Sequence, residues 1–213
     1  LYAYLVQNNK PTSLKKPSVD AFAVENHDLD INVTVENSEA CPRYAGVTVK
    51  GVTVKESPEW LQNKLRIIGL RPINNVVDIT NYIVHAFGQP LHCFDADKIK
   101  GGEVVVRTMP EGTPFVTLDG VERKLSDRDL MICDTEKPMC IAGVFGGLDS
   151  GSTETTKDVF IESAYFHPTW VRKTARRHGL NTDASFRFER GIDPNITIYS
   201  VSYTHLRAHE TEL

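Results

Sequence analysis

The sequence lacks an excess of positive charge and a cysteine framework. Among 213 residues, 24 lysines and arginines stand against 28 aspartates and glutamates, which gives a formal net charge of −4. A chain without a basic field does not hold nucleic acid over its whole surface, so any RNA contact must be local. The four cysteines are widely spaced and form no CxxC pair, which argues against a zinc ribbon and a disulfide scaffold.

Membrane segments and common enzyme signatures are missing too. No run approaches the roughly 20 apolar residues of a membrane span, and the first residues lack the basic start and long apolar core of a signal peptide. The glycines of Gly143–Gly147 are followed by no GK[ST], and there is no GxSxG, HExxH or zinc-deaminase signature. We therefore expect a cytoplasmic protein that binds no metal and needs no cofactor for its own chemistry.

The composition is that of a globular protein, with 40% hydrophobic and 24% charged residues. The length supports one substantial core. Residues 1–40 are polar and without a sustained period, which predicts a linker or lead-in segment. We expect the folded domain over residues 41–199, and we interpret residues 200–213 as a non-native tail because they continue no apolar stripe.

Strands are predicted wherever short apolar runs alternate with turn residues. Valines alternate between Tyr44 and Val54, interrupted by two glycines. Further runs, separated by turn signals such as Asp119-Gly120, cover residues 103–107, 114–118, 129–133, 139–144 and 159–165. These runs predict a sheet-rich centre.

Three helices are predicted. Ser57 and Pro58 read as a cap and first helical residue before an apolar stripe that ends at Gly69, and Pro168 opens a second stripe that ends at Gly179. Residues 74–87 combine β-branched side chains with a helical period, and we favour a helix there. Together these elements predict an α+β fold, with a mixed or antiparallel sheet-rich core and flanking helices in a single domain.

Several segments mix glycine with functional side chains where core packing alone would favour simple hydrophobic residues. Singly they are weak signals. A lone histidine such as His92 is more often structural than catalytic, and Glu162 in an apolar strand is equally compatible with an outward-facing position. The basic cluster on the last predicted helix, Arg172, Lys173, Arg176 and Arg177, is by itself typical of a solvated face.

In combination and in order, these segments are more specific. The run contains Arg43-Tyr44, Gly69-Leu70-Arg71, Val77-Asp78-Ile79-Thr80-Asn81-Tyr82, Gly88-Gln89-Pro90-Leu91-His92-Cys93-Phe94-Asp95, Gly146-Gly147, Arg176-Arg177-His178-Gly179-Leu180 and Arg187-Phe188-Glu189-Arg190-Gly191. From about Cys41 to Asn195 it resembles the third and fourth modules of bacterial phenylalanyl-tRNA synthetase beta subunits. The resemblance implies an editing domain that hydrolyses Tyr-tRNA(Phe) as a proofreading step of protein biosynthesis.

The resemblance also implies roles for individual residues. The catalytic set would be Thr80, Asn81, His92 and Thr182, and the substrate-binding set would be Arg71, Gly143, Gly146, Glu162 and Ala184. The implied partners are the acceptor end of tRNA(Phe) and the synthetase alpha subunit; for the basic cluster we expect RNA binding. ATP and magnesium would serve the synthetic site on that partner subunit, and we expect no aminoacylation by this segment.

Proofreading has a clear physical basis here. An apolar synthetic pocket rejects an added hydroxyl poorly, by roughly a hundredfold in the comparable valine–threonine case, whereas a site built to bond that hydroxyl discriminates far more strongly. We expect an ionised Glu162 to accept the phenolic proton, and the two glycines and Ala184 to leave room for the ring. His92 would orient or deprotonate the water or bond the terminal ribose, and Arg71 would hold the terminal phosphate or the polar end of the substrate.

Two alternatives stay open at this point. One is a non-catalytic RNA-binding or subunit-packing module that depends on the basic helix alone. The other is a relative that clears a different aminoacyl ester.

Overall fold

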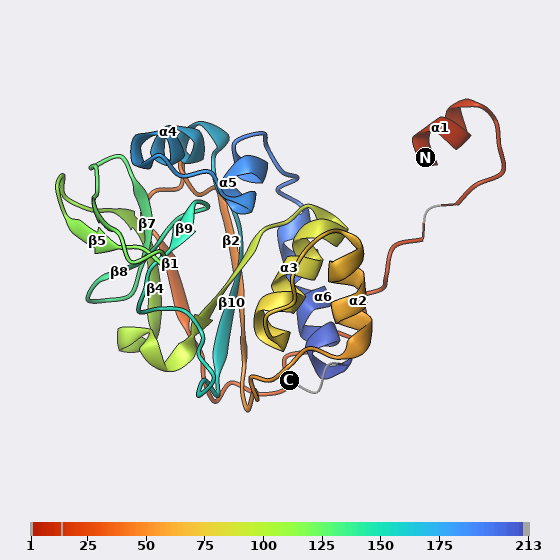
Figure 1. Ribbon diagram of the computed structural model, residues 1–213, viewed down its shortest axis with the longest axis horizontal. Helices are drawn as coiled ribbons and strands as arrows, with labels where there is room; N and C mark the ends of the chain where they lie inside the picture. The colour runs from red at the N-terminus through yellow and green to blue at the C-terminus, as the bar shows by residue number, and fades with distance from the viewer. Residues whose placement is uncertain (1, 14, 211–213) are drawn as a thin grey trace.

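A computed structural model describes residues 2–13 and 15–210 (Figure 1). The lead-in begins with a short helix, α1 (Tyr2–Gln7), which stands apart from the main body. Most of the following residues are extended or in turns until β1 (Asn32–Val35), which pairs in parallel with β4 (Glu103–Thr108). The folded part therefore starts before Cys41, because β1 completes the edge of a sheet whose next strand lies some seventy residues further along the chain.

The larger sheet has five strands in the order β1-β4-β7-β8-β9. Its remaining strands are β7 (Leu130–Cys133), β8 (Pro138–Ile141) and β9 (Phe145–Gly146), which pair antiparallel from β4 onwards. Two short 3₁₀ helices (Ala96–Lys98 and Lys100–Gly102) precede β4, and a small hairpin of β5 (Pro114–Val116) and β6 (Glu122–Lys124) follows it. The strand predictions over residues 103–144 are confirmed to within a few residues.

The smaller sheet has three antiparallel strands, with β10 (Val159–Tyr165) between β2 (Arg43–Val49) and β3 (Leu91–Asp95). Successive β10 side chains point to opposite faces. Val159 and Ile161 pack on the helical side, whereas Phe160 and Ala164 pack into the main core. The alternation places Glu162 on the same face as Phe160, toward the larger sheet.

Helices cover the other face of the smaller sheet (Figure 1). Of these, α3 (Asn75–Phe87) and α6 (Ile196–Glu210) pack on the sheet, and α2 (Glu59–Ile67) packs on α3. The helix favoured for residues 74–87 is confirmed as α3: its Asn74 side chain accepts from the Val77 amide, and Gly88 ends it with a φ of 75°. Ser57 is not the cap of α2, because its hydroxyl donates to Asp78 instead.

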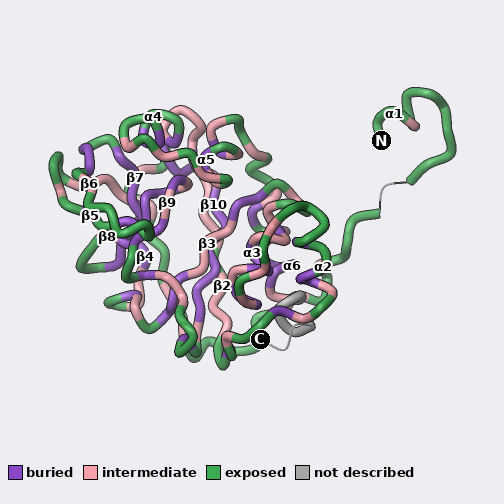
Figure 2. Tube along the Cα trace, in the orientation of Figure 1, coloured by how far each residue is buried: buried purple, intermediate pink, exposed green. Residues whose placement is uncertain are grey.

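Two further helices lie at the end of the sheets near β9. The first, α4 (Pro168–His178), has the predicted opening proline and closing glycine, and α5 (Asp183–Phe188) follows it with a Thr182–Ser185 capping box. Both contribute apolar side chains, including Val171 and Phe188, to the main core. Figure 2 shows the buried residues concentrated along the strands and on the inner faces of the helices.

The C-terminal edge of the fold differs from expectation. Residues 200–210 continue helix α6, and the side chains from Ser200 to Thr204 are buried against the body. The helix carries small polar residues, such as Ser200 and Thr204, on buried positions, so it shows no apolar stripe in the sequence. Residues 211–213 lie outside the described residues.

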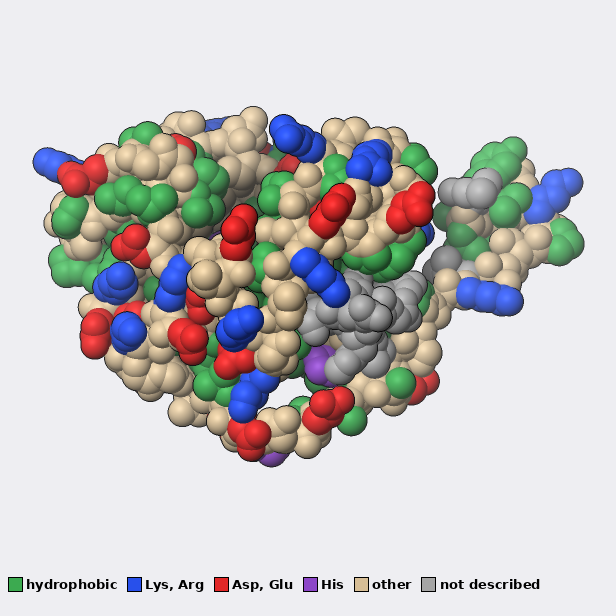
Figure 3. Space-filling view, turned by 60° about the horizontal axis from the view of Figure 1, so that its bottom comes forward, with side chains coloured by type: hydrophobic (Ala, Val, Ile, Leu, Met, Phe, Trp, Pro, Cys, Tyr) green, Lys and Arg blue, Asp and Glu red, His purple; other side chains and the backbone are tan. Residues whose placement is uncertain are grey.

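The predicted fold class is confirmed as α+β. Within the described part of the chain, no helix combines the length and apolar character needed to cross a bilayer. Lysines, arginines and acidic residues are interspersed over the face in Figure 3.

Candidate active site

A cavity of about 240 Å³ lies where the two sheets, α3 and α5 meet. This volume is below the roughly 300–1,000 Å³ of pockets for drug-sized ligands, which fits a single aminoacyl group. Seven of the nine predicted editing residues line it: Asn81, His92, Gly143, Gly146, Glu162, Thr182 and Ala184. A cavity of about 360 Å³ beside the β5–β6 hairpin contains none of them.

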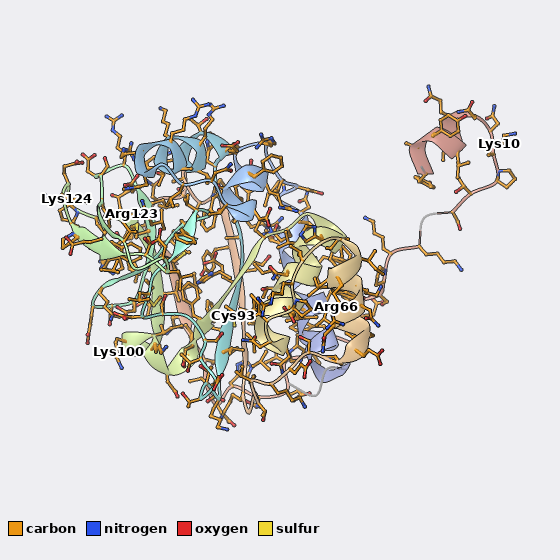
Figure 4. The ribbon with its side chains drawn as sticks, in the orientation of Figure 1. Lys10, Arg66, Cys93, Lys100, Arg123 and Lys124 are labelled. Carbon is orange, nitrogen blue, oxygen red and sulfur yellow. The ribbon has the colours of Figure 1, made fainter. Side chains whose placement is uncertain are left out.

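Strand register brings the two titratable groups together. Glu162 on β10 is the antiparallel partner of His92 on β3, so both side chains leave the same face of the sheet as direct neighbours. Cys93, labelled in Figure 4, follows His92 and packs on the opposite, helical side. A cross-strand pair that faces a cavity is the geometric centre of the site.

Glu162 is 5% exposed, and burial raises its pKa to about 8, although a hydrogen bond from Tyr44 works in the opposite direction. The Tyr44 hydroxyl donates to Oε2 over 2.8 Å. The other oxygen of Glu162 makes no hydrogen bond to any described residue. At neutral pH the group is therefore mainly a neutral acid, which corrects the expectation of an ionised carboxylate.

His92 is uncharged at neutral pH, because burial lowers its pKa to about 4. Its Nε2 is buried and has no hydrogen-bond partner within the described part of the chain. The ring packs edge-on against Phe94, with 4.4 Å between centroids. The ring nitrogen is thus a buried polar atom that lacks a hydrogen bond, and a water molecule or hydroxyl bound beside it would supply one.

Asn81 is the other free polar group of the wall. It lies on α3, is half-buried, and its amide makes no hydrogen bond to any residue that the structure describes. The amide offers two donors and an acceptor to a ligand.

Thr182 also lines the cavity, but its hydroxyl is already engaged. It caps α5 by accepting from the Ser185 amide, and its proton goes to the Val144 carbonyl oxygen over 2.8 Å. Thr182 therefore shapes the wall by fixing α5, and it has no proton left for a substrate.

The two predicted glycines serve different purposes. A Cβ at Gly146 would lie 2.9 Å from Leu118 and 3.0 Å from the His92 ring, so glycine leaves the space that His92 occupies. Gly143 has a φ of +67°, and its Cβ would meet Phe166 at 2.9 Å in the core. Glycine is therefore needed at position 143 for its positive φ and for the close packing of the core, not to make room for a ligand ring.

Arg71 and Thr80 do not line this cavity. Arg71 is exposed in the segment before α3. Thr80 is 9% exposed, and its hydroxyl donates to the Val77 carbonyl oxygen one turn back over 2.7 Å. Arg71 and Thr80 therefore lie away from the cavity that the other seven predicted residues line.

Sequence reasoning missed several residues of the site. Four further residues line the cavity, namely Cys140, Leu118, His85 and Asp183. Tyr44, which lies outside the cavity, donates a hydrogen bond to Glu162. Cys140 is buried, and its pKa is well above the usual value because of desolvation, so the thiol is not a nucleophile at neutral pH. These residues come from α3, α5, the β5–β6 turn and two strands, and only the packing of these elements, which sequence alone does not reveal, brings them together.

The basic cluster lies on α4, and all four of its side chains are exposed. Arg177 is paired with the buried Asp129, which His178 also contacts at 2.7 Å. Arg172, Lys173 and Arg176 make no ion pair with the described residues. A third cavity, of about 270 Å³, is lined by Lys173, Arg177, Arg128, His167, Thr169, Trp170 and Glu39.

Comparisons with known proteins identify the family of the chain. The family model described as the B3/4 domain matches residues 40–205. The phenylalanine–tRNA ligase beta subunit of Bacteroides fragilis (strain YCH46) is 86% identical over 99% of this chain and 26% of its own length. The corresponding subunits of Bacteroides thetaiotaomicron and Porphyromonas gingivalis are 82% and 61% identical, over 99% and 94% of this chain and 26% and 24% of their own lengths.

The chain therefore belongs to the B3/4 domain family. The resemblance drawn from the motifs is also confirmed, since the chain matches the B3/4 segment of phenylalanine–tRNA ligase beta subunits and spans about a quarter of the length of these relatives. An N-terminal fragment of the phenylalanyl-tRNA synthetase beta-subunit from Pyrococcus horikoshii aligns at 17% identity with a TM-score of 0.46, over 74% of this chain and 52% of that one.

Proposed function

We propose that this segment is an editing site that hydrolyses the ester of tyrosine mischarged onto tRNA(Phe). One observation carries the proposal: a buried carboxyl with one free oxygen stands beside an unpartnered histidine in the wall of a small cavity. A phenolic hydroxyl would give that oxygen a partner, and phenylalanine would leave it without one. Such a difference separates tyrosine from phenylalanine more strongly than an apolar pocket does.

The chemistry needs a bound water rather than a covalent nucleophile. In the proposed step, the water oxygen forms a bond to the ester carbonyl carbon, the bond from that carbon to the ribose oxygen breaks, and the ribose oxygen takes up a proton. Neutral His92 accepts a hydrogen bond from the water, and the Asn81 amide donates to the developing oxyanion or to the ribose. Free tyrosine and uncharged tRNA are the products.

We place this step in the cytoplasm and assign it no cofactor. ATP and Mg²⁺ would act only at the synthetic site of the partner alpha subunit.

The test is deacylation by the full-length subunit, assembled with its partner subunit, in the absence of ATP. We expect release of tyrosine from Tyr-tRNA(Phe) and much slower release of phenylalanine from Phe-tRNA(Phe). Equal rates, or none above the uncatalysed rate, would instead support the non-catalytic RNA-binding module. Faster release of another amino acid from a panel of mischarged tRNAs would point to a different ester.

Replacing His92 with alanine should slow single-turnover hydrolysis of Tyr-tRNA by about tenfold. This is less than the roughly 10²- to 10⁴-fold contributed by a well-matched general base, because a group whose pKa is about 4 is a weak base at neutral pH. His27→Ala is the matched control, since the His27 side chain is exposed and does not line this cavity. An unchanged rate in His92→Ala would remove His92 from the mechanism.

We further propose that α4 contacts the tRNA backbone. Arg172 and Arg176 are exposed and free of described ion-pair partners, and α4 leads directly into the α5 wall of the cavity. The adjoining cavity adds Lys173, Arg128 and the ring of Trp170, a combination suited to phosphate and base contacts.

Replacing both Arg172 and Arg176 with alanine should weaken tRNA binding and reduce the slope of log affinity against log salt by about two. The matched control is Lys64→Ala with Arg66→Ala on α2, which removes the same charge far from α4; Arg66 is labelled in Figure 4. Equal salt slopes in the two double variants would exclude α4 from the RNA contact.

A further inference from the structure

Tyr44 reaches Glu162 from the neighbouring strand. On β2, Gly46 stands directly opposite Glu162 and Tyr44 opposite Ala164, so Tyr44 is the diagonal neighbour of Glu162 on the same face. Because Gly46 has no side chain, Tyr44 is the β2 residue whose side chain contacts the Glu162 carboxyl. Its hydroxyl donates to Oε2 over 2.8 Å.

The hydroxyl of Tyr44 keeps its proton under all physiological conditions. Burial and the neighbouring Glu162 raise the pKa of Tyr44 well above its usual value. Tyr44 can therefore donate to Glu162 whether the carboxyl is neutral or ionised. One carboxyl oxygen is thus permanently occupied.

Tyr44 does not line the cavity, whereas Glu162 does. We propose that Tyr44 is a positioning residue for substrate selection: it holds one oxygen of Glu162 so that the other faces the cavity as the partner of the tyrosine hydroxyl. This inference rests on the proposed editing function.

The arrangement has an energetic reason. A buried carboxyl without a partner is costly, and an empty cavity, or one holding phenylalanine, provides none. Tyr44 supplies a hydrogen bond in every state of the cavity, so Glu162 stays in place between turnovers. Only the free oxygen then distinguishes the two amino acids.

The test is Tyr44→Phe, which removes only the hydroxyl, in the full-length subunit assembled with its partner. We expect the ratio of kcat/KM for Tyr-tRNA over Phe-tRNA to fall about three- to tenfold, the effect of one hydrogen bond. Tyr165→Phe is the matched control, because Tyr165 ends β10 and its hydroxyl has no partner among the described residues. Its ratio should not change.

A double-variant cycle shows whether Tyr44 acts through Glu162. Adding Tyr44→Phe to Glu162→Ala should cause no further loss of the ratio, and a multiplicative loss would overturn the positioning role. In the wild-type protein the hydrogen bond from Tyr44 lowers the pKa of Glu162. Removing that bond in Tyr44→Phe should therefore raise this pKa, which infrared spectroscopy of the Glu162 carboxyl band against pH measures. An unmoved titration would also overturn it.

The two proposals fail in different ways. A wild-type enzyme that shows no preference for Tyr-tRNA removes the editing function itself. A wild-type enzyme with that preference, together with an unchanged ratio in Tyr44→Phe, refutes the role of Tyr44 and leaves the editing function standing.

Discussion

Glu162→Ala is expected to lower the preference for Tyr-tRNA over Phe-tRNA by about a hundredfold, the upper range for a hydrogen bond that involves a buried, ionisable group. The loss should fall on the tyrosine ester, because in our proposal phenylalanine has no hydroxyl to reach the carboxyl oxygen. The measurement is kcat/KM for both esters with the same enzyme preparation. Equal losses on the two esters would count against Glu162 as the hydroxyl contact.

The same assay has a pH signature. The pKa of Glu162 is raised from 4.5 to about 8, so the group is neutral at pH 7 and ionises as the pH rises further. A carboxylate accepts a phenolic proton more strongly than a neutral acid does. The tyrosine preference of the wild-type enzyme, after subtraction of uncatalysed hydrolysis, should therefore increase between about pH 7 and pH 9, and Glu162→Gln should be flat.

Ala184→Trp should reduce hydrolysis of Tyr-tRNA by more than about a hundredfold, since misplacing a substrate by about an ångström already costs that much. Ala184 lines the cavity from α5, and an indole in its place would occupy the space of the substrate ring. Synthesis of Phe-tRNA by the assembled enzyme should be unaffected, because the synthetic site lies on the other subunit in our proposal.

Phe186→Trp is the control for Ala184→Trp. Phe186 is on the same helix but is 47% exposed, with Arg190 stacked on its ring. This variant should keep wild-type hydrolysis. Full activity in Ala184→Trp would contradict the placement of the substrate in the cavity.

Local patterns in the sequence predicted most of the regular elements. Caps and stops such as Asn74, Pro168 and Gly179 act within one helical turn, so they can be recognised without the tertiary structure. Four strands were missed: β6 and β9 are only three and two residues long, and β1 and β3 are defined by long-range partners. β1 lies in a polar segment and is a strand because β4 pairs with it, and β3 carries His92 and Asp95 among its apolar residues.

The residues of the site could be predicted in part, but their charge states and hydrogen bonds could not. Motif resemblance selected Glu162 and His92, and the structure places them as cross-strand neighbours. The charge states were not predictable, because burial sets them: it turns Glu162 into a neutral acid and His92 into a neutral base. Thr80 and Thr182 matched by residue type, yet their hydroxyls are used by the backbone around them.

The most direct test of the account is a crystal structure of the full-length subunit, assembled with its partner, with a non-hydrolysable tyrosyl ester analogue bound. We predict the ring in the cavity between α3 and α5, with the phenolic oxygen about 2.5–3.0 Å from the Glu162 oxygen that Tyr44 leaves free. A phenolic oxygen that points to solvent, or an analogue bound outside this cavity, would contradict the account.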